Sequence, residues 1–170
     1  MNYLNKLFSI FLLFFLFTNL SFSNEPVAYI DIDFILKNSD IGKKSIEKIN
    51  AQNNINIQDL KKKEKILKDL EIEIASKKNI ISKEAFDKEV IIFRKNIDQF
   101  KIEQQQIIKD FNDYKKKEID KVFQTISPII NSYMEKNSVK ILFDAKNIFM
   151  ARNDLNLTND ILEAINKEAK

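Results

Sequence analysis

The sequence predicts a mostly helical α+β protein, in which one long antiparallel helical hairpin extends from a small three-stranded β head. No glycine or proline occurs between Gly42 and Pro128, a stretch of about eighty-five residues. A stretch of that length far exceeds the roughly 11-residue average helix, so it predicts an extended arm. Short apolar segments with strand-like alternation stand on both sides of it, at residues 27–32 and 139–151. We expect these segments to meet in one head.

The first 23 residues have the composition of a secretory signal peptide. Lys6 makes the start positive, residues 7–17 are almost wholly apolar, and residues 18–23 become polar again. Small side chains at Ser21 and Ser23 predict cleavage near Ser23. An uncleaved membrane anchor is the alternative, but the apolar core is short compared with the roughly 20 residues of a spanning helix. No Cys follows the core, which excludes lipoprotein processing.

Composition excludes most kinds of chemistry. The chain has no Cys and no His, so it can form no disulfide, no imidazole base at neutral pH and no common zinc site. Its single glycine leaves no glycine-rich phosphate loop. The net charge of +3 is small for a dedicated nucleic-acid binder. We therefore expect no enzyme activity, no cofactor, no metal and no nucleic-acid partner.

Residues 24–45 are predicted to form the first part of the head. A strand over residues 27–32 would place on one apolar face Ala28, Ile30 and Ile32. A short helix or turn is expected over residues 34–38. Ser39 or Asp40 is a suitable N-cap for the long helix that follows.

Residues 46–124 are predicted to form the hairpin arm. The polar cluster at residues 76–83 is the one break in the long stretch, so we place the turn at the tip there. Ser82 is the expected N-cap of the returning helix, and Glu84 is favourably placed in its first turn.

The returning helix has the clearest periodicity in the chain. Apolar residues step alternately by four and three, which predicts a coiled-coil seam of about four heptads. The seam comprises Phe86, Val90, Phe93, Ile97, Phe100, Gln104, Ile107, Phe111 and Tyr114. Four more apolar residues lie outside the seam: Ile91, Ile92, Ile102 and Ile108. We interpret these four as candidates for contact with a bound partner, the alternative being contact with the outgoing helix.

Residues 125–170 are predicted to complete the head. Pro128 is expected to kink the helix because it lacks a backbone donor. Two strands, at residues 139–143 and 148–151, are expected to form a β-hairpin through a polar turn at residues 144–147. Thr158 is the expected N-cap of a last amphipathic helix.

A head of three short strands has exposed sheet edges and little core of its own. We therefore expect it to assemble with other copies of the chain. The predicted contact residues lie on the strands: Tyr29, Leu142, Phe143 and Phe149.

Basic residues gather toward the tip half of the arm. Residues 60–101 contain twelve Lys or Arg against eight Asp or Glu, a surplus of four positive charges. The predicted basic tip comprises Lys77, Lys78, Lys83, Arg94 and Lys95. Such charges are commonly a solvated face, and the functional alternative is long-range attraction of acidic partners or anionic lipid headgroups.

Several short segments occur in a characteristic order: AYID at residues 28–31, then Ser39, Gly42 and Lys43, then residues 148–151, and LTNDI at residues 157–161. Together they resemble the Skp/OmpH family of periplasmic chaperones. The likeness covers essentially the whole chain after the leader, and its specificity lies in the order of these segments around the breaker-free stretch. The family tends to have Asp before the Leu-Thr pair, where this chain has Asn156.

The resemblance implies a homotrimer in which the strands of three heads close into a small barrel, with three arms around a central cavity. Family members hold unfolded outer-membrane protein precursors in that cavity without ATP. For this chain the resemblance implies an ATP-independent periplasmic holdase that prevents aggregation of these clients in transit. Lipopolysaccharide binding through basic arm residues has been proposed for some members, so anionic lipid is a further candidate partner.

A structural coiled-coil spacer or adaptor of the cell envelope is the alternative function. It would need the same leader and the same heptads, but not strands at both ends of the chain that meet in one head. The Lys runs at residues 61–63 and 115–117 suggest nucleic-acid binding as a third alternative, which export disfavours.

Overall fold

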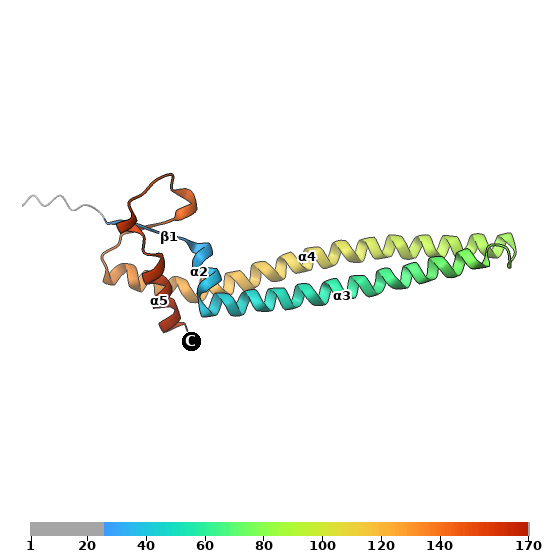
Figure 1. Cartoon of the computed structure of the whole chain (residues 1–170), viewed down its shortest axis with the longest axis horizontal. Helices are drawn as coiled ribbons and strands as arrows, with labels where there is room; N and C mark the ends of the chain where they lie inside the picture. Colours follow the sequence, from blue (N-terminus) through green and yellow to red (C-terminus); the bar gives the residue numbers. More distant parts are fainter. Residues whose placement is uncertain (1–25, 170) are drawn as a thin grey trace, which may run out of the picture.

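The structure is a computed structural model that describes residues 26–169. Its elements are β1 (Val27–Ile30), α2 (Ile32–Asn38), α3 (Asp40–Lys77), α4 (Lys83–Lys136), β2 (Ile141–Asp144), η1 (Ala145–Asn147), η2 (Asn153–Leu155) and α5 (Thr158–Glu168). Figure 1 shows α3 and α4 side by side as a long hairpin, with the other elements gathered at one end. The predicted signal peptide and its cleavage site lie outside the described residues.

β1 and α2 join at Asp31. Its carboxylate accepts a hydrogen bond from the Phe34 N–H at 2.9 Å, so Asp31 is the N-cap of α2. The strand therefore ends at Ile30, earlier than predicted, because Ile32 already belongs to the helix. Ala28 and Ile30 are buried, as the two-residue alternation predicts.

α3 starts directly after α2, at the predicted cap. Ser39 Oγ accepts from the Gly42 N–H at 3.2 Å, and Asn166 Oδ1 on α5 accepts from the Asp40 N–H at 2.9 Å. The C-terminal helix thus helps to satisfy the free donors at the start of α3. Gly42 lies where α3 passes closest to α2, since a Cβ there would stand 1.9 Å from the Leu36 carbonyl oxygen.

The arm is the antiparallel pair of α3 and α4. Lys77 ends α3 and Lys83 begins α4, so the turn falls within the segment where the sequence places it. Ser82 caps α4 as predicted, accepting from the Ala85 N–H at 3.3 Å. The 38 residues of α3 give the arm a length of about 57 Å at 1.5 Å per residue.

The base of the arm continues into the head as one helix. α4 continues through Pro128, where a kink is predicted, and ends at Lys136. Proline removes one backbone donor, but the nearby Ile126 is fully buried and its packing supports the helix. Closer to the arm, the Glu118 carboxylate is largely buried. The Lys121 ammonium holds the pKa of Glu118 below its usual range, against the opposing effect of burial.

The end of α4 is a Schellman motif. The Val139 N–H donates to the Met134 carbonyl at 2.9 Å, and the Ser138 N–H donates to the Glu135 carbonyl at 3.3 Å. Ser138 has a φ of 56°, in the left-handed region that favours glycine. This reversal turns the chain back toward β1.

The sheet has two strands, which corrects the three-stranded head predicted from the sequence. β2 pairs with β1 in parallel, with Val27 opposite Ile141 and Ile30 opposite Asp144. A parallel pair needs a long crossover connection, and here the whole arm lies between the two strands.

Residues 148–151 form no strand, and the predicted β-hairpin is wrong. Asp144 accepts a hydrogen bond from the Lys146 N–H at 3.2 Å and begins the turn η1, which leads the chain away from β2. Tyr29 on β1 forms a bridge with Asn156, so the later segment contacts the sheet at that residue instead.

Thr158 does not cap α5 in the predicted way. Its hydroxyl accepts from the Asp31 N–H at 2.9 Å and donates to Asn156 Oδ1 at 2.6 Å. Asn156 Oδ1 also accepts from the Thr158 N–H at 3.0 Å, so Asn156 satisfies the start of the helix. Thr158 instead ties α5 to the β1–α2 junction.

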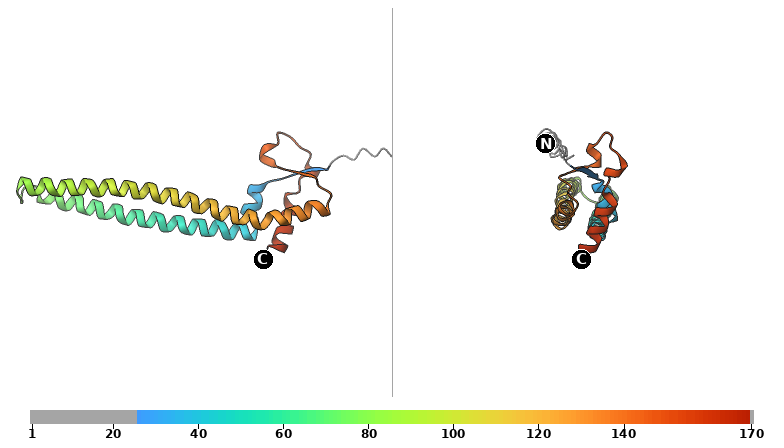
Figure 2. Two further views of the ribbon diagram at one scale, coloured as in Figure 1. Left: turned by 180° about the vertical axis from the view of Figure 1, so that it is seen from behind. Right: turned by 90° about the vertical axis from the view of Figure 1, so that its left-hand side faces the viewer.

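The head core is small and draws on four elements. Its buried members are Ile30, Ile35, Val122, Ile126, Ile161 and Ile165. Figure 2 shows α5 beside the base of the arm, where it packs on α4 and α2. The arm therefore starts from a head that is stabilised by residues from both ends of the chain.

Candidate functional site

The arm has a seam of its own and a second set of apolar side chains outside it. The predicted seam residues of α4 are partly buried, apart from Gln104, which is exposed. Ile91, Ile92, Ile102 and Ile108 are between 54 and 60% exposed. These four side chains contribute little to holding the hairpin together, and their apolar surface is open to a partner.

The outgoing helix carries a comparable set that sequence reasoning missed. The exposed isoleucines of α3 are Ile55, Ile57, Ile66 and Ile72. The signal was present, because each stands outside the stripe formed by Leu67, Leu70 and Ile74. Both helices of the arm therefore present apolar side chains to solvent.

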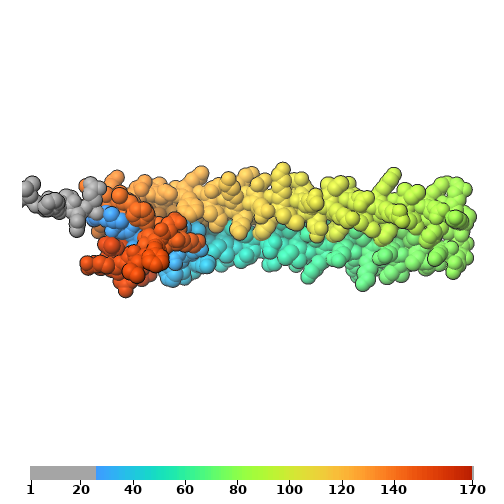
Figure 3. Space-filling view, turned by 90° about the horizontal axis from the view of Figure 1, so that it is seen from above, coloured from blue at the N-terminus to red at the C-terminus, as the bar shows by residue number. Residues whose placement is uncertain are grey.

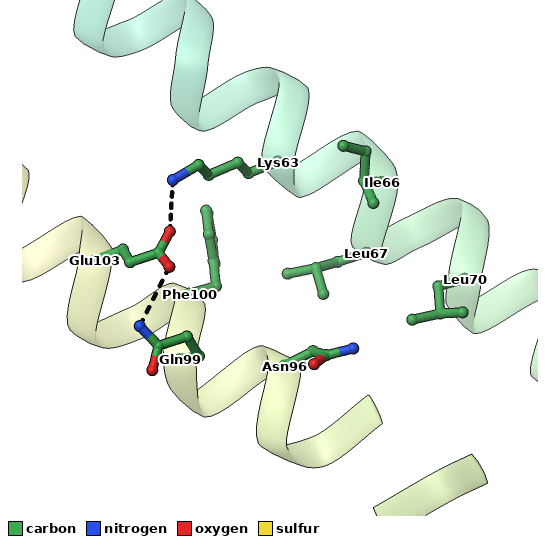
Figure 4. Close-up of a pocket in the computed structure, with 8 residues that line it drawn as sticks. All are labelled: Lys63, Ile66, Leu67, Leu70, Asn96, Gln99, Phe100 and Glu103. Carbon is green, nitrogen blue, oxygen red and sulfur yellow. Dashed lines mark hydrogen bonds and ion pairs between the residues drawn. The ribbon is translucent and has the colours of Figure 1, made fainter. Parts of the chain in front are cut away.

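An apolar hollow opens between the two helices of the arm (Figure 4). It has a volume of about 320 Å³ and is lined by Lys63, Ile66, Leu67, Leu70, Asn96, Gln99, Phe100 and Glu103. Leu67 and Leu70 face Phe100 and Asn96 across the gap (Figure 4). Ile66 is 65% exposed, so it forms an open apolar edge of the hollow.

An ion pair closes one end of this hollow. Lys63 Nζ pairs with the Glu103 carboxylate across the helices, and Gln99 Nε2 donates to the same carboxylate at 3.2 Å (Figure 4). The Lys63 ammonium, with help from Gln99, holds the pKa of Glu103 below its usual range. Since the two charges offset each other, the rim is close to neutral, with the amides of Asn96 and Gln99 as its other polar groups.

A smaller hollow of about 120 Å³ follows toward the tip. It is lined by Leu70, Ile74, Lys77, Glu89, Ile92 and Phe93. Lys77 Nζ lies 3.3 Å from Glu89 Oε1 across the helices and 2.8 Å from Glu73 Oε1 on its own helix. These hydrogen bonds, the one to Glu73 first, raise the pKa of Lys77. We call the two hollows together the arm groove, which is bounded by the pairs Lys63–Glu103 and Lys77–Glu89.

A third hollow, nearer the head, is more polar. Its volume is also about 320 Å³, and it is lined by Gln52, Asn56, Ile107, Asp110, Phe111 and Tyr114. Gln52 Nε2 donates to Asn56 Oδ1 at 3.0 Å, so amides fill a place that apolar side chains occupy elsewhere in the arm. The apolar lining of the arm is therefore concentrated in the arm groove.

The sequence of the hairpin and the head matches a known family. The family model described as outer membrane protein (OmpH-like) matches residues 26–165. The chain belongs to the OmpH-like family. This confirms the resemblance found in the sequence.

A solved structure shares the OmpH-like fold. It is the crystal structure of a candidate outer membrane chaperone (OmpH-like) from Caulobacter crescentus CB15, with a TM-score of 0.75. The two proteins are 15% identical, and the alignment covers 84% of each chain. At that identity the likeness shows a common fold. A search of curated proteins finds no match.

The tip of this OmpH-like arm carries the predicted basic residues. Lys77 is neutralised by Glu73 and Glu89, as described above. Within residues 26–169, no carboxylate lies at ion-pair distance from any of Lys78, Lys83, Arg94 and Lys95. Ile80, in the turn itself, is 79% exposed. The net positive field of the tip therefore comes from residues other than Lys77.

The head exposes a second apolar surface. Phe149 is 101% exposed, and Phe143 and Met150 are also exposed. The space-filling view shows the segment after β2 covering one face of the head (Figure 3). A hollow of about 370 Å³ lies there, lined by Val27, Ala28, Tyr29, Phe143, Asn147, Ile148, Met150, Ala151 and Leu155. Leu142 differs from the other predicted contact residues, because it packs against the head core.

The described residues hold no group of three or more Asp or Glu side chains suited to a metal ion. No helix within residues 26–169 is long and apolar enough to cross a membrane.

Proposed function

We propose that this chain is an ATP-independent periplasmic holdase that binds unfolded outer-membrane protein precursors and prevents their aggregation. Membership of the OmpH-like family and a fold shared with a candidate outer membrane chaperone support this proposal. The arm surface supports it independently. A holdase needs apolar surface with modest affinity spread over many contacts, and binding to the unfolded chain then keeps it from aggregating.

The observation that carries the proposal is the set of exposed isoleucines on an arm whose seam is already filled. The proposed client contacts are drawn from both helices and include Ile91, Ile92, Ile102 and Ile108. The eight exposed isoleucines of α3 and α4, with Ile80 in the turn as a ninth, are costly in a monomeric soluble protein unless a partner covers them.

The test uses residues 24–170 with a urea-unfolded transmembrane β-barrel protein as client. Light scattering after dilution of the urea should stay low when the chain is present and rise when it is absent. Native mass spectrometry should show the client bound without added nucleotide. Unchanged scattering in the presence of the chain would refute the holdase function.

We also propose that the chain forms a homotrimer through its head, residues 24–45 and 125–170, with the arm, residues 46–124, projecting from it. The support is the two-stranded sheet, in which the outer edge of β2 is short and unpaired within the described residues, and the exposed Phe143 and Phe149. Tyr29 and Leu142 remain in the proposed contact region. A charge at Leu142 would also disrupt the head core, so that substitution does not isolate assembly.

Phe143→Lys and Phe149→Lys test the assembly, since both side chains are exposed and carry no part of the head core. Each variant should sediment as a monomer with unchanged helical circular dichroism. Ile80→Lys at the arm tip is the matched control and should remain a trimer. Trimers in both head variants would refute assembly through this surface.

The structural-spacer alternative is disfavoured by one observation. Strands from the two ends of the described chain meet as β1 and β2, which a simple spacer does not require. If the chain assembles normally but an unfolded client still aggregates in its presence, the spacer function would be favoured instead.

Anionic lipid, including lipopolysaccharide, is proposed as a second partner of the basic tip. The reason is that no carboxylate partner within residues 26–169 is found for Lys78, Lys83, Arg94 and Lys95.

A further inference from the structure

The exposed isoleucines of the arm do not all face the same way. Ile66 precedes the seam residue Leu67 by one position, and Ile92 precedes Phe93 by one, so each lies about 100° from its seam. Both line the arm groove. Ile72 stands two positions from both Leu70 and Ile74, and Ile102 stands two positions from both Phe100 and Gln104. Each therefore lies about 200° around the helix from its seam, and neither lines a hollow of the groove.

Ile66 and Ile92 belong to one continuous surface. Their hollows share Leu70, and the floor between them is formed by seam side chains of both helices. A ligand that lies there contacts the exposed isoleucines and the half-buried seam together. A ligand on the Ile72 or Ile102 face meets isoleucines of one helix alone.

The polar groups of the groove indicate what kind of ligand fits. Both ends are closed by ion pairs, Lys63–Glu103 and Lys77–Glu89, so neither end offers an unpaired charge. Between them Asn96 and Gln99 present amides, which can both donate and accept hydrogen bonds. A neutral amide rim over an apolar floor complements the backbone and apolar side chains of a polypeptide. It is a poor match for a lipid headgroup or a nucleotide phosphate.

The size of the groove agrees with such an occupant. From Lys63 to Lys77 the helix advances fourteen residues, about 21 Å at 1.5 Å per residue. An extended chain covers that length with about six residues at 3.3 Å each. The larger hollow, about 320 Å³, lies at the lower end of the size range for ligand pockets and suits one bulky apolar side chain.

We propose that the arm groove is the principal docking site for an extended apolar segment of the unfolded client, with Ile66 and Ile92 as its contact residues. This inference rests on the proposed holdase function and narrows it. Ile92 and the α3 residue Ile66 make the strong contacts, whereas Ile72 and Ile102 face away from the docked segment. The arm groove would then face the space in which the client is held.

The absence of cysteine from the chain allows a direct test. Unique cysteines are introduced by Ile66→Cys and Ile92→Cys in the groove, and by Ile72→Cys and Ile102→Cys as controls of similar exposure. Each is labelled with a benzophenone maleimide and illuminated with a urea-unfolded transmembrane β-barrel protein as probe. Crosslinks to the probe from positions 66 and 92 should exceed those from 72 and 102 several-fold, because only the labels in the groove lie against the docked segment.

Serine variants give a second measurement without a label. Ile66→Ser and Ile92→Ser should each raise the Kd for the unfolded probe about fivefold, and Ile72→Ser and Ile102→Ser should leave it within about twofold. All four residues are exposed, so none of these substitutions removes a buried core side chain.

Three results would overturn the inference, and they are distinguishable. Equal crosslinking from all four positions, with aggregation still suppressed, would leave the holdase function intact and refute the groove. Crosslinks from position 66 to another copy of the chain, unaffected by the probe, would assign the groove to contacts between arms. If the unlabelled parent protein does not suppress aggregation of the probe, both the proposed function and the proposed docking site would be refuted.

Discussion

Gly42→Ala sets helix propensity against tertiary packing at the junction of α2 and α3. In an exposed helix interior, replacing glycine by alanine stabilises by about 1 kcal/mol. Here the new Cβ would lie 1.9 Å from the Leu36 carbonyl oxygen and 2.7 Å from Ser39 Oγ. The Leu36 contact is with backbone, so no side-chain rotation can relieve it. α2 would have to move away by about 1.5 Å to restore an ordinary contact distance. This is a severe case of overpacking.

We take the overpacking cost as about 3 kcal/mol, the upper part of its usual range. After the gain in helix propensity, Gly42→Ala should destabilise the head by about 2 kcal/mol. Urea unfolding should be monitored by near-ultraviolet circular dichroism. This signal reports on the head, because Tyr29 and Tyr133 both lie there. Lys43→Ala, at the next and exposed position, is the control and should change stability by less than about 0.5 kcal/mol.

All variants must be compared at one protein concentration, because assembly couples stability to concentration. An increase of about 1 kcal/mol in Gly42→Ala would refute the reasoning. It would mean that α2 moves aside without loss of packing energy. Helix propensity alone would then decide the sign of the change in stability.

Three further predictions concern the tip, the end of α4 and pH. Lys78→Glu with Lys83→Glu should slow capture of an acidic unfolded client at low salt without changing helical circular dichroism; capture rates independent of salt in the parent would contradict this. Lys77 is left unchanged because it joins the two helices through Glu89. Ser138→Gly should stabilise the head by about 0.5 kcal/mol by relieving a positive φ, and a less stable variant in urea unfolding would contradict it. The lowered pKa values of Glu103 and Glu118 stabilise the folded state at pH values above the usual carboxyl pKa. This stabilisation is lost as the pH falls through the pKa values of the folded state. The raised pKa of Lys77 adds stability that is lost only as pH rises through its folded value. With no His, urea midpoints should therefore be constant between about pH 5.5 and 8.5, and a clear change within that window would refute it.

The candidate site was predictable in part. The seam of α4 follows from its heptad spacing, and apolar residues outside that spacing are exposed, Ile92 and Ile102 among them. Sequence reasoning did not separate these two, because their different directions matter only once α3 is placed beside α4. Ile66 was missed for the same reason, since the edge of a groove is formed by two helices together.

The ion pairs at the two ends of the groove were also not predicted from the sequence. Lys63 and Glu103 are forty positions apart, and Lys77 and Glu89 are twelve apart across the turn. Any of several lysines near residues 61–78 could have faced a carboxylate on the returning helix. The register of the two helices selects which ones do.

The sequence by itself determined the helical hairpin and the starts of its two helices. The absence of glycine and proline leaves helix as the favoured local conformation, and Ser39 and Ser82 supply caps through contacts within three residues. Only the tertiary structure decided the sheet. Residues 148–151 have the local character of a strand, but a strand needs a free edge in the correct register, and that depends on how distant segments pack. Here β2 pairs with β1 along its length and Asn156 bridges to Tyr29, so residues 148–151 remain outside the sheet with Phe149 exposed.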